Sequence, residues 1–139
     1  MKKEEIMKID KIDHIGIAVK KIEEAARFHS ETFGLKVSEP IEVPSQKVKI
    51  AFMEIGEVKL ELIEPLGEDS PIFKFIQKRG EGLHHICFQV EDIDQALKEL
   101  KNKNIKLIDE NPRMGATGKR IAFLHPDSVY GVLIELKEK

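Results

Sequence analysis

An internal repeat is the feature of this sequence that most constrains its fold. The pattern of residues 12–19 returns at residues 83–90, which lie 71 positions later. The pattern of residues 58–62 returns at residues 132–136, which lie 74 positions later. The small difference between the two offsets is what a loop insertion would leave. The chain is therefore expected to contain two similar modules.

Each half has the pattern of a strand, a helix and further strands. Alternating β-branched residues predict a strand at 12–19, and apolar residues at helical spacing predict a helix at about 22–33 that ends at Gly34. Ser70 and Pro71 are typical of the start of a short connecting helix. The other predicted elements are strands near 35–43, 47–55 and 58–64, then a strand at 83–90, a helix at 93–103, and strands near 105–109, 119–125 and 131–137.

These elements predict an α+β fold in which both modules have the order βαβββ. We expect one compact domain over residues 1–139. Module one spans about residues 10–66, the connecting helix about 70–80, and module two about 82–137.

Composition excludes several classes of protein. With 139 residues, 41% of them hydrophobic and 35% charged, the chain resembles neither a disordered nor a membrane protein. Its 23 basic and 25 acidic residues give a net charge of −2, which argues against nucleic acid or an anionic membrane as the main partner. Cys87 is the only cysteine, so no intrachain disulfide can form. No apolar run is long enough to span a membrane, so a soluble, cytoplasmic protein is expected.

Strand alternation places two histidines and two glutamates on the sheet face that is turned away from the predicted module helices. His14 and His85 alternate with apolar residues of their strands, and Glu61 and Glu135 each lie between two apolar residues. Side chains of neighbouring strand residues point to opposite faces, so these four polar groups share the face opposite the apolar ones. They also occupy equivalent positions in the two modules.

Two imidazoles and two carboxylates in this arrangement are typical of a site for one divalent metal ion. Cobalt(II), nickel(II), zinc(II) and manganese(II) all accept mixed nitrogen and oxygen ligands. The alternative interpretation is structural, because a strand histidine is usually a satisfied core or surface residue and a glutamate between leucines usually faces solvent. Recurrence of both residue types in both modules favours the metal interpretation. On the residues alone, the metal and the structural interpretation both remain open.

The other histidines and the cysteine are less informative. Alternation places His84 on the helix side, so His85 is preferred as the ligand. His29 lies near the apolar stripe of a helix and is expected to be structural. His125 ends a strand, where hairpin packing is favoured over a polar contact at the mouth of a cavity. Cys87 is expected to be a small buried residue.

Residues 113–120 combine two glycines with three cations, Arg113, Lys119 and Arg120. The segment could form either a phosphate cradle or a β-hairpin turn. It lacks the spacing of a P-loop and leads into a strand, so the turn is favoured, with its cations available to an anionic ligand.

Taken together, these motifs resemble the vicinal oxygen chelate superfamily, which includes glyoxalase I, extradiol dioxygenases, an epimerase branch and antibiotic-binding resistance proteins. The resemblance covers about residues 10–137. Several branches share the motif Ile-Asp-His-Ile-Gly-Ile-Ala-Val at 12–19. The epimerase branch is indicated by the sequences at 70–76, 80–86, 123–126 and 131–136.

The resemblance implies a glyoxalase-like fold, a cupped mixed sheet with helices on its outer face. It also implies one divalent metal per chain, either cobalt, zinc, manganese or nickel, with His14, Glu61, His85 and Glu135 as ligands. The implied activity is a metal-dependent epimerase that interconverts the stereoisomers of methylmalonyl-CoA through a metal-stabilised enolate, with Glu135 as one catalytic base. A homodimer is expected as well, since open sheet edges need covering.

An acyl-CoA substrate carries phosphates, for which Arg113, Lys119 and Arg120 are the candidate partners. One departure from the family pattern concerns the second base. Some relatives are expected to carry it on the strand after the loop at 42–46, where this chain has Lys47, Lys49 and Ile50 and no carboxylate before Glu54. Relatives with an acidic residue in the loop itself would place it near Ser45, and neither Ser45 nor Gln46 is a base at neutral pH. The alternatives to the epimerase are a glyoxalase I-type lactoylglutathione lyase and a metal-free small-molecule binding protein of the same fold.

Overall fold

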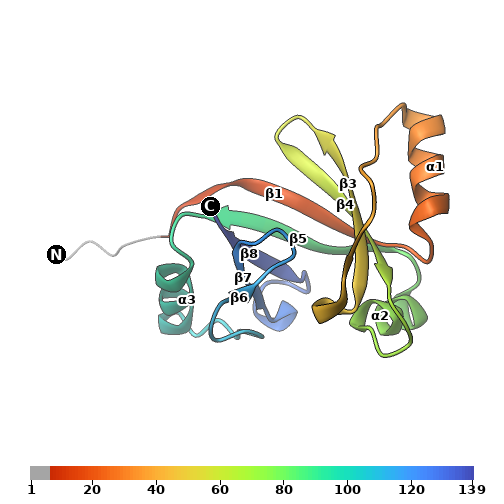
Figure 1. Ribbon diagram of the computed structural model, residues 1–139. Coiled ribbons are helices and arrows are strands. Elements are labelled where there is room, and N and C mark those ends of the chain that lie inside the picture. Colours follow the sequence, from red (N-terminus) through yellow and green to blue (C-terminus); the bar gives the residue numbers. More distant parts are fainter. Residues whose placement is uncertain (1–6) are drawn as a thin grey trace. The chain divides into compact units, whose positions relative to one another are not determined.

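The computed structural model describes residues 7–139 and contains two modules with the order βαβββ, joined by a helix (Figure 1). This confirms the predicted α+β class and the element order. The first module consists of β1 (Ile9–Ala18), α1 (Ile22–Phe33), β2 (Ile41–Val43), the 3₁₀ turn η1 (Pro44–Gln46), β3 (Val48–Ile55) and β4 (Val58–Pro65). The connecting helix is α2 (Pro71–Arg79). The second module consists of β5 (Gly82–Val90), α3 (Ile93–Asn102), β6 (Arg113–Met114), β7 (Arg120–Leu124), the 3₁₀ turn η2 (Pro126–Ser128) and β8 (Ile134–Glu138).

The chain divides into two compact units whose boundaries fall inside strands. Residues 14–84 form the first unit, and residues 85–139 form the second together with residues 7–13. Both β1 and β5 therefore pass from one unit to the other, and α2 belongs to the first unit. The expectation of one domain over the whole chain stays a prediction.

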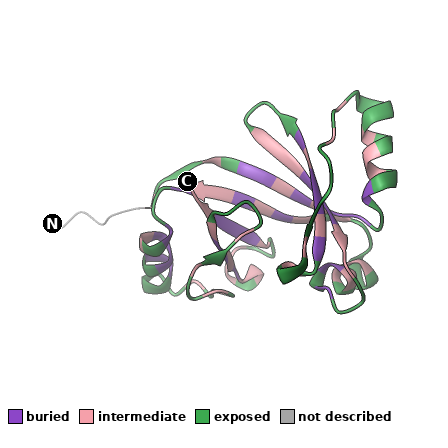
Figure 2. Ribbon diagram, in the orientation of Figure 1, coloured by how far each residue is buried: buried purple, intermediate pink, exposed green. Residues whose placement is uncertain are grey.

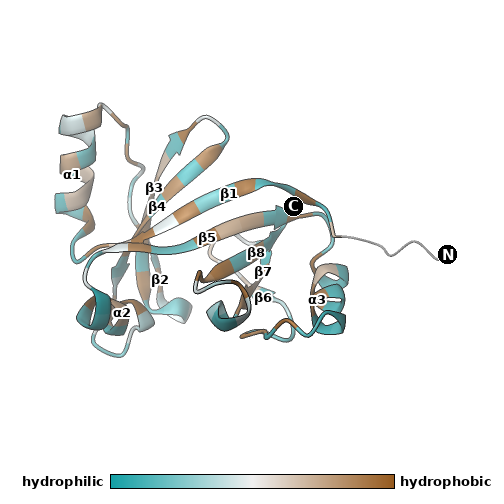
Figure 3. Cartoon of the chain, turned by 180° about the vertical axis from the view of Figure 1, so that it is seen from behind, coloured by the Kyte–Doolittle hydropathy of each residue, from teal (hydrophilic) through white to brown (hydrophobic). Residues whose placement is uncertain are grey.

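In the first unit, the strands follow the order β2-β3-β4-β1. Strand β4 pairs antiparallel with β3 and parallel with β1. Leu62 packs in a buried cluster with Ile22 of α1, whereas the next residue, Ile63, packs in a cluster with Ile72 of α2. Neighbouring apolar residues of β4 therefore pack on opposite faces, whereas other parts of the strands show alternating bands of opposite hydropathy (Figure 3).

One contact of this sheet was not predicted. The face that carries His14 also carries Ala18 and, as expected, is turned away from the module helix α1. The connecting helix α2 covers part of this face, because Ala18 is fully buried in the cluster that contains Ile72. The reason is that α2 is amphipathic and must bury its own apolar residues, with Phe75 and Ile76 packing against the same cluster.

In the second unit, the strands follow the order β5-β8-β7-β6. Helix α3 buries Ala96, Leu97 and Leu100 against strand residues that include Leu124 and Leu136. Both buried and exposed positions occur along this helix (Figure 2). The prediction of a strand near 105–109 is wrong. That segment contributes only an isolated bridge, and its backbone bonds are irregular, with the Lys106 N–H donating to a serine hydroxyl.

Residues 113–121 form a β-hairpin, which confirms the turn interpretation. Arg113 and Met114 pair antiparallel with Ile121 and Arg120. At the turn, the Gly115 N–H donates to the Lys119 carbonyl at 2.8 Å. A Cβ at Gly115 would lie 2.8 Å from a methyl carbon of Ile121, so the close approach of the strands requires glycine here.

The helix ends combine predicted and unexpected caps. The Ser70 hydroxyl accepts a hydrogen bond from the Ile72 N–H, as expected for the start of α2. Helices α1 and α3 share a cap that the sequence did not reveal. The Ile22 N–H donates to Glu64 at 2.8 Å, and the Ile93 N–H donates to Glu138 at 3.3 Å. In both modules a glutamate at the end of the last strand therefore caps the helix of the same unit.

No helix within residues 7–139 combines the length and the apolar character needed to cross a membrane.

Candidate active site

In the first unit, His14 and Glu61 form a buried pair. They lie on the adjacent parallel strands β1 and β4, whose register places Gly16 opposite Glu61 and His14 opposite Lys59. His14 Nε2 lies 3.6 Å from Glu61 Oε1, and only 7% and 11% of these side chains are exposed. A carboxylate and an imidazole that are this buried need each other or another polar group.

In the second unit, His85 and Glu135 form the corresponding pair. They lie on the adjacent parallel strands β5 and β8, where Cys87 is opposite Glu135. His85 Nε2 lies 3.0 Å from Glu135 Oε1, and the exposed fractions of the side chains are 4% and 8%. The internal repeat of the sequence is therefore also a repeat of side-chain pairing.

The donor chemistry of both pairs fits a divalent cation of borderline softness. Each pair offers one imidazole nitrogen and one carboxylate oxygen, which face each other on neighbouring strands. Nitrogen and oxygen donors of this kind bind zinc, cobalt, nickel and manganese. Each unit thus brings one histidine and one glutamate together in a buried position, and the assignment of the four residues as metal ligands stays a prediction.

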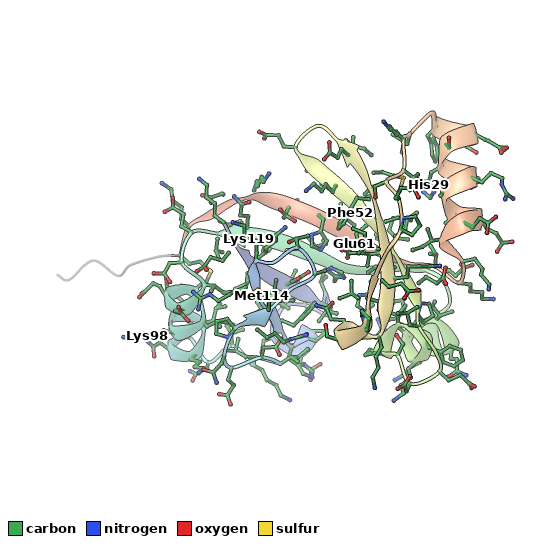
Figure 4. All side chains as sticks on the ribbon, viewed as in Figure 1. His29, Phe52, Glu61, Lys98, Met114 and Lys119 are labelled. Carbon is green, nitrogen blue, oxygen red and sulfur yellow. The ribbon has the colours of Figure 1, made fainter. Side chains whose placement is uncertain are left out.

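Two phenylalanines that no sequence motif indicated lie next to these pairs. Phe52 of β3 is directly opposite Glu61 in the antiparallel register, so both side chains point to the same face (Figure 4). Phe123 of β7 is directly opposite Glu135, and its ring lies edge-on to His85 with a centroid distance of 5.7 Å. Phe52 and Phe123 are 71 positions apart, so the offset of the repeat could have identified them.

A cation lies over each of these rings. The ammonium of Lys59 is 5.7 Å from the centroid of Phe52, and the guanidinium of Arg113 is 5.5 Å from that of Phe123. Both distances are in the range of cation–π attraction. Arg113 also forms an ion pair with Asp109 at 3.2 Å.

Arg120, one of the predicted substrate-binding cations, is engaged in the scaffold of the second unit. Its guanidinium donates to both oxygens of Glu138, at 3.1 and 2.9 Å, and to Asp94 at 2.9 Å. The hydrogen bonds that Arg120 donates to Glu138 and then to Asp94 raise the pKa of Arg120, and the Arg120 guanidinium lowers the pKa of Glu138. Lys119 lies exposed in the turn of the hairpin (Figure 4). The role of all three cations in substrate binding stays a prediction.

A buried ion pair in the second unit was not foreseen either. Lys137 Nζ lies 3.2 Å from Asp13 Oδ2, with 13% and 9% of the side chains exposed. Asp13 directly precedes His14 in the chain, and Lys137 is two residues beyond Glu135 on β8. No short sequence motif indicates this ion pair, because its two residues are 124 positions apart.

The remaining histidines have local contacts. The ring of His84 packs edge-on against Phe75 of α2 at 4.8 Å, and His29 lies 2.8 Å from the Ala25 carbonyl within α1. His125 caps η2 by accepting a hydrogen bond from the Asp127 N–H, a role that differs from the hairpin packing that was favoured.

The turn η1 before β3 contains no carboxylate. Ser45 is exposed within η1, and the next cation, Lys47, forms an ion pair with Asp69 at 2.8 Å. The hydrogen bond and the charge of Lys47 lower the pKa of Asp69. These side chains provide no base at Ser45.

Comparison with known proteins agrees with this geometry. The model of the Glyoxalase/Bleomycin resistance protein/Dioxygenase superfamily matches residues 13–123. The mitochondrial methylmalonyl-CoA epimerase of Homo sapiens is 41% identical over 134 residues, which cover 96% of this chain and 76% of the human protein. The ethylmalonyl-CoA/methylmalonyl-CoA epimerase of Cereibacter sphaeroides is 39% identical over 132 residues, which cover 94% of this chain and 98% of that protein.

A solved structure leads to the same family. The Streptomyces coelicolor methylmalonyl-CoA epimerase in complex with 2-nitronate-propionyl-CoA superposes with a TM-score of 0.89 at 36% identity, covering 95% of this chain and 96% of that one. The similarity extends over both modules and confirms the resemblance inferred from the motifs. The chain belongs to the glyoxalase/bleomycin resistance protein/dioxygenase superfamily.

Proposed function

We propose that this chain is a methylmalonyl-CoA epimerase that depends on one divalent metal ion bound by His14, Glu61, His85 and Glu135. The observation that carries the proposal is the repeated pairing of a buried histidine with a buried glutamate, one pair in each unit. Relatives that are methylmalonyl-CoA epimerases match nearly the whole chain and support the reaction.

The metal supplies one chemical function in this proposal. When bound, it acts as a Lewis acid and as a template for the oxygens of the substrate, which lowers the cost of the negative charge that develops there. The donor set suits cobalt, zinc, manganese or nickel, and the choice among them is a matter for metal analysis.

The protein must remove the proton from the carbon between the thioester and the carboxylate and return it on the other face. We assign the removal or the return on one face to a carboxylate oxygen of Glu135. Its burial limits competition from water, and His85 Nε2 at 3.0 Å orients the carboxylate. Inversion needs a second proton-transferring group on the opposite face, and that group is unassigned because the segment at 44–47 has no carboxylate.

The proposal includes the substrate's phosphates, a partner and a location. Arg113, Lys119 and Arg120 remain the candidate phosphate contacts of an acyl-CoA. Because Arg120 forms hydrogen bonds with Glu138 and Asp94, we assign the greater part of the phosphate binding to the exposed Lys119. We also propose a homodimer and a cytoplasmic location.

Hydrogen–deuterium exchange tests the proposed reaction. The purified protein is incubated with methylmalonyl-CoA in D₂O, and deuterium at the α-carbon is followed by NMR. We expect exchange that a chelator abolishes and that an added divalent metal restores. In a parallel experiment, the protein is incubated instead with the hemithioacetal of glutathione and methylglyoxal, and conversion of this compound is followed.

The outcomes separate the alternatives. If the protein converts the hemithioacetal and does not exchange the α-proton of methylmalonyl-CoA, it is a glyoxalase I-type lyase. If it binds no metal and converts neither compound, the metal-free binding protein replaces the epimerase. Exchange that persists unchanged in the chelator would contradict the role of the metal.

A further inference from the structure

Lys59 lies on the same face of the first unit as the His14–Glu61 pair. It precedes Glu61 by two residues on β4, so the two side chains point the same way. In the parallel register of β1 and β4 it is directly opposite His14. Its ammonium lies over Phe52, which is itself opposite Glu61. Its positions relative to His14, Glu61 and Phe52 thus place the cation beside the His14–Glu61 pair.

The fold does not use this cation for an ion pair. Within residues 7–139, no carboxylate lies within ion-pair distance of the Lys59 ammonium, and its exposed cross-strand neighbour Glu54 forms no pair with it. Other partly buried cations are matched, Lys49 with Glu64 and Lys137 with Asp13.

The internal repeat shows that this position does not require a charge. At the offset of 74, the counterpart of Lys59 in the second module is Leu133, an apolar residue. A half-buried lysine therefore stands where the same architecture accepts a leucine. Its ammonium, which has no carboxylate partner among residues 7–139, is available to an anionic ligand.

We propose that Lys59 binds the free carboxylate of the substrate and is a specificity-determining residue, an inference that rests on the proposed epimerase function. The Lys59 ammonium lies over the ring of Phe52, which is directly opposite Glu61, so the cation is on the side of the His14–Glu61 pair. An ammonium donates charge-assisted hydrogen bonds to a carboxylate, and an acyl thioester without that carboxylate cannot accept them. Lys59 thereby selects 2-carboxyacyl thioesters over simple acyl thioesters.

The test compares two ligands that differ only in the carboxylate. Dissociation constants of methylmalonyl-CoA and propionyl-CoA are measured by isothermal titration calorimetry for the parent, Lys59→Met and Lys59→Arg. The matched control is Lys98→Met on α3, an exposed lysine of the second unit (Figure 4). Metal content per chain and melting temperature are recorded for every variant, so that loss of metal or of folding is recognised separately.

We expect Lys59→Met to weaken binding of methylmalonyl-CoA by about tenfold, as loss of one charge-assisted contact would. Its affinity for propionyl-CoA should change less than about twofold, and Lys59→Arg should recover most of the preference. Equal weakening of both ligands by Lys59→Met, or no weakening of either, overturns the inference.

The failure of each proposal has its own signature. A parent that prefers methylmalonyl-CoA while Lys59→Met keeps that preference overturns the role of Lys59 and leaves the epimerase standing. A parent that shows neither the preference nor α-proton exchange overturns both. If Lys59→Met melts well below the parent, the measurements are repeated with Lys59→Gln. The ratio of the dissociation constants of propionyl-CoA and methylmalonyl-CoA then tests the role of Lys59 in the same way.

Discussion

Replacing Glu138 by glutamine is expected to destabilise the second unit through the start of α3. One carboxylate at the end of β8 accepts two hydrogen bonds from Arg120 and one from the Ile93 N–H, the first N–H of the helix. Glutamine keeps an oxygen that can accept from Ile93, but it removes the charge that attracts the guanidinium and the positive end of the helix.

The size of the effect follows from these contacts. A negative charge near a helix N-terminus contributes about 0.3–1 kcal/mol, and a capping hydrogen bond about 1 kcal/mol. Because glutamine keeps part of the hydrogen bonding, we expect a loss of about 1 kcal/mol. For a chain of this length, such a loss lowers the melting temperature by about 3–4 °C.

The pH dependence gives the sharper test. Arg120 holds the pKa of Glu138 below its ordinary value of 4.5, so the folded state favours the charged carboxylate. This stabilisation is fully present above the pKa of the unfolded chain and is lost as the pH falls through the lower pKa of the folded state. The difference in melting temperature between parent and Glu138→Gln should be full near pH 7 and shrink below about pH 4.5.

Thermal unfolding followed by circular dichroism from pH 3 to pH 7 measures both quantities. Glu64→Gln is the matched variant, since Glu64 caps α1 in the first unit and lies 3.6 Å from Lys49. Glu39→Gln, at an exposed residue outside the helices and strands, serves as the control. Equal melting temperatures for parent and Glu138→Gln at pH 7, or a difference that is constant down to pH 3, would refute the reasoning.

Four further predictions concern the site and assembly. His85→Ala should lose metal in elemental analysis while His84→Ala retains it, because His84 packs against a helix; the reverse result would contradict the assignment. Glu135→Gln should lower both metal affinity and α-proton exchange, and full exchange would exclude it as a base. Lys119→Ala should raise the Michaelis constant for methylmalonyl-CoA more than it lowers turnover. If the parent and the variant have the same Michaelis constant, Lys119 does not bind a phosphate of the substrate. Sedimentation at micromolar concentration should show a dimer; a monomer would end that proposal.

Much of the candidate site could be predicted because its determinants are periodic. In a strand, side chains alternate between faces whatever the rest of the fold, so the position of His14 among apolar neighbours already assigns its face. The repeat then relates His14 to His85 and Glu61 to Glu135 without knowledge of the sheet. Local steric and hydrogen-bonding rules likewise predicted the ends of the helices at Gly34 and Ser70.

Pairing across strands was decided only by the tertiary structure. Phe52 meets Glu61 because β3 and β4 adopt one particular register, and Lys137 meets Asp13 across 124 positions of sequence. Arg120 has the sequence context of an exposed turn cation, yet in the structure it joins β7 to Glu138 and to Asp94 on α3. Periodicity assigns a residue to a face, whereas its neighbour on that face depends on strand register and twist and on where the helices pack. These are set by the burial of apolar surface summed over the whole unit, and no short segment of sequence carries that sum.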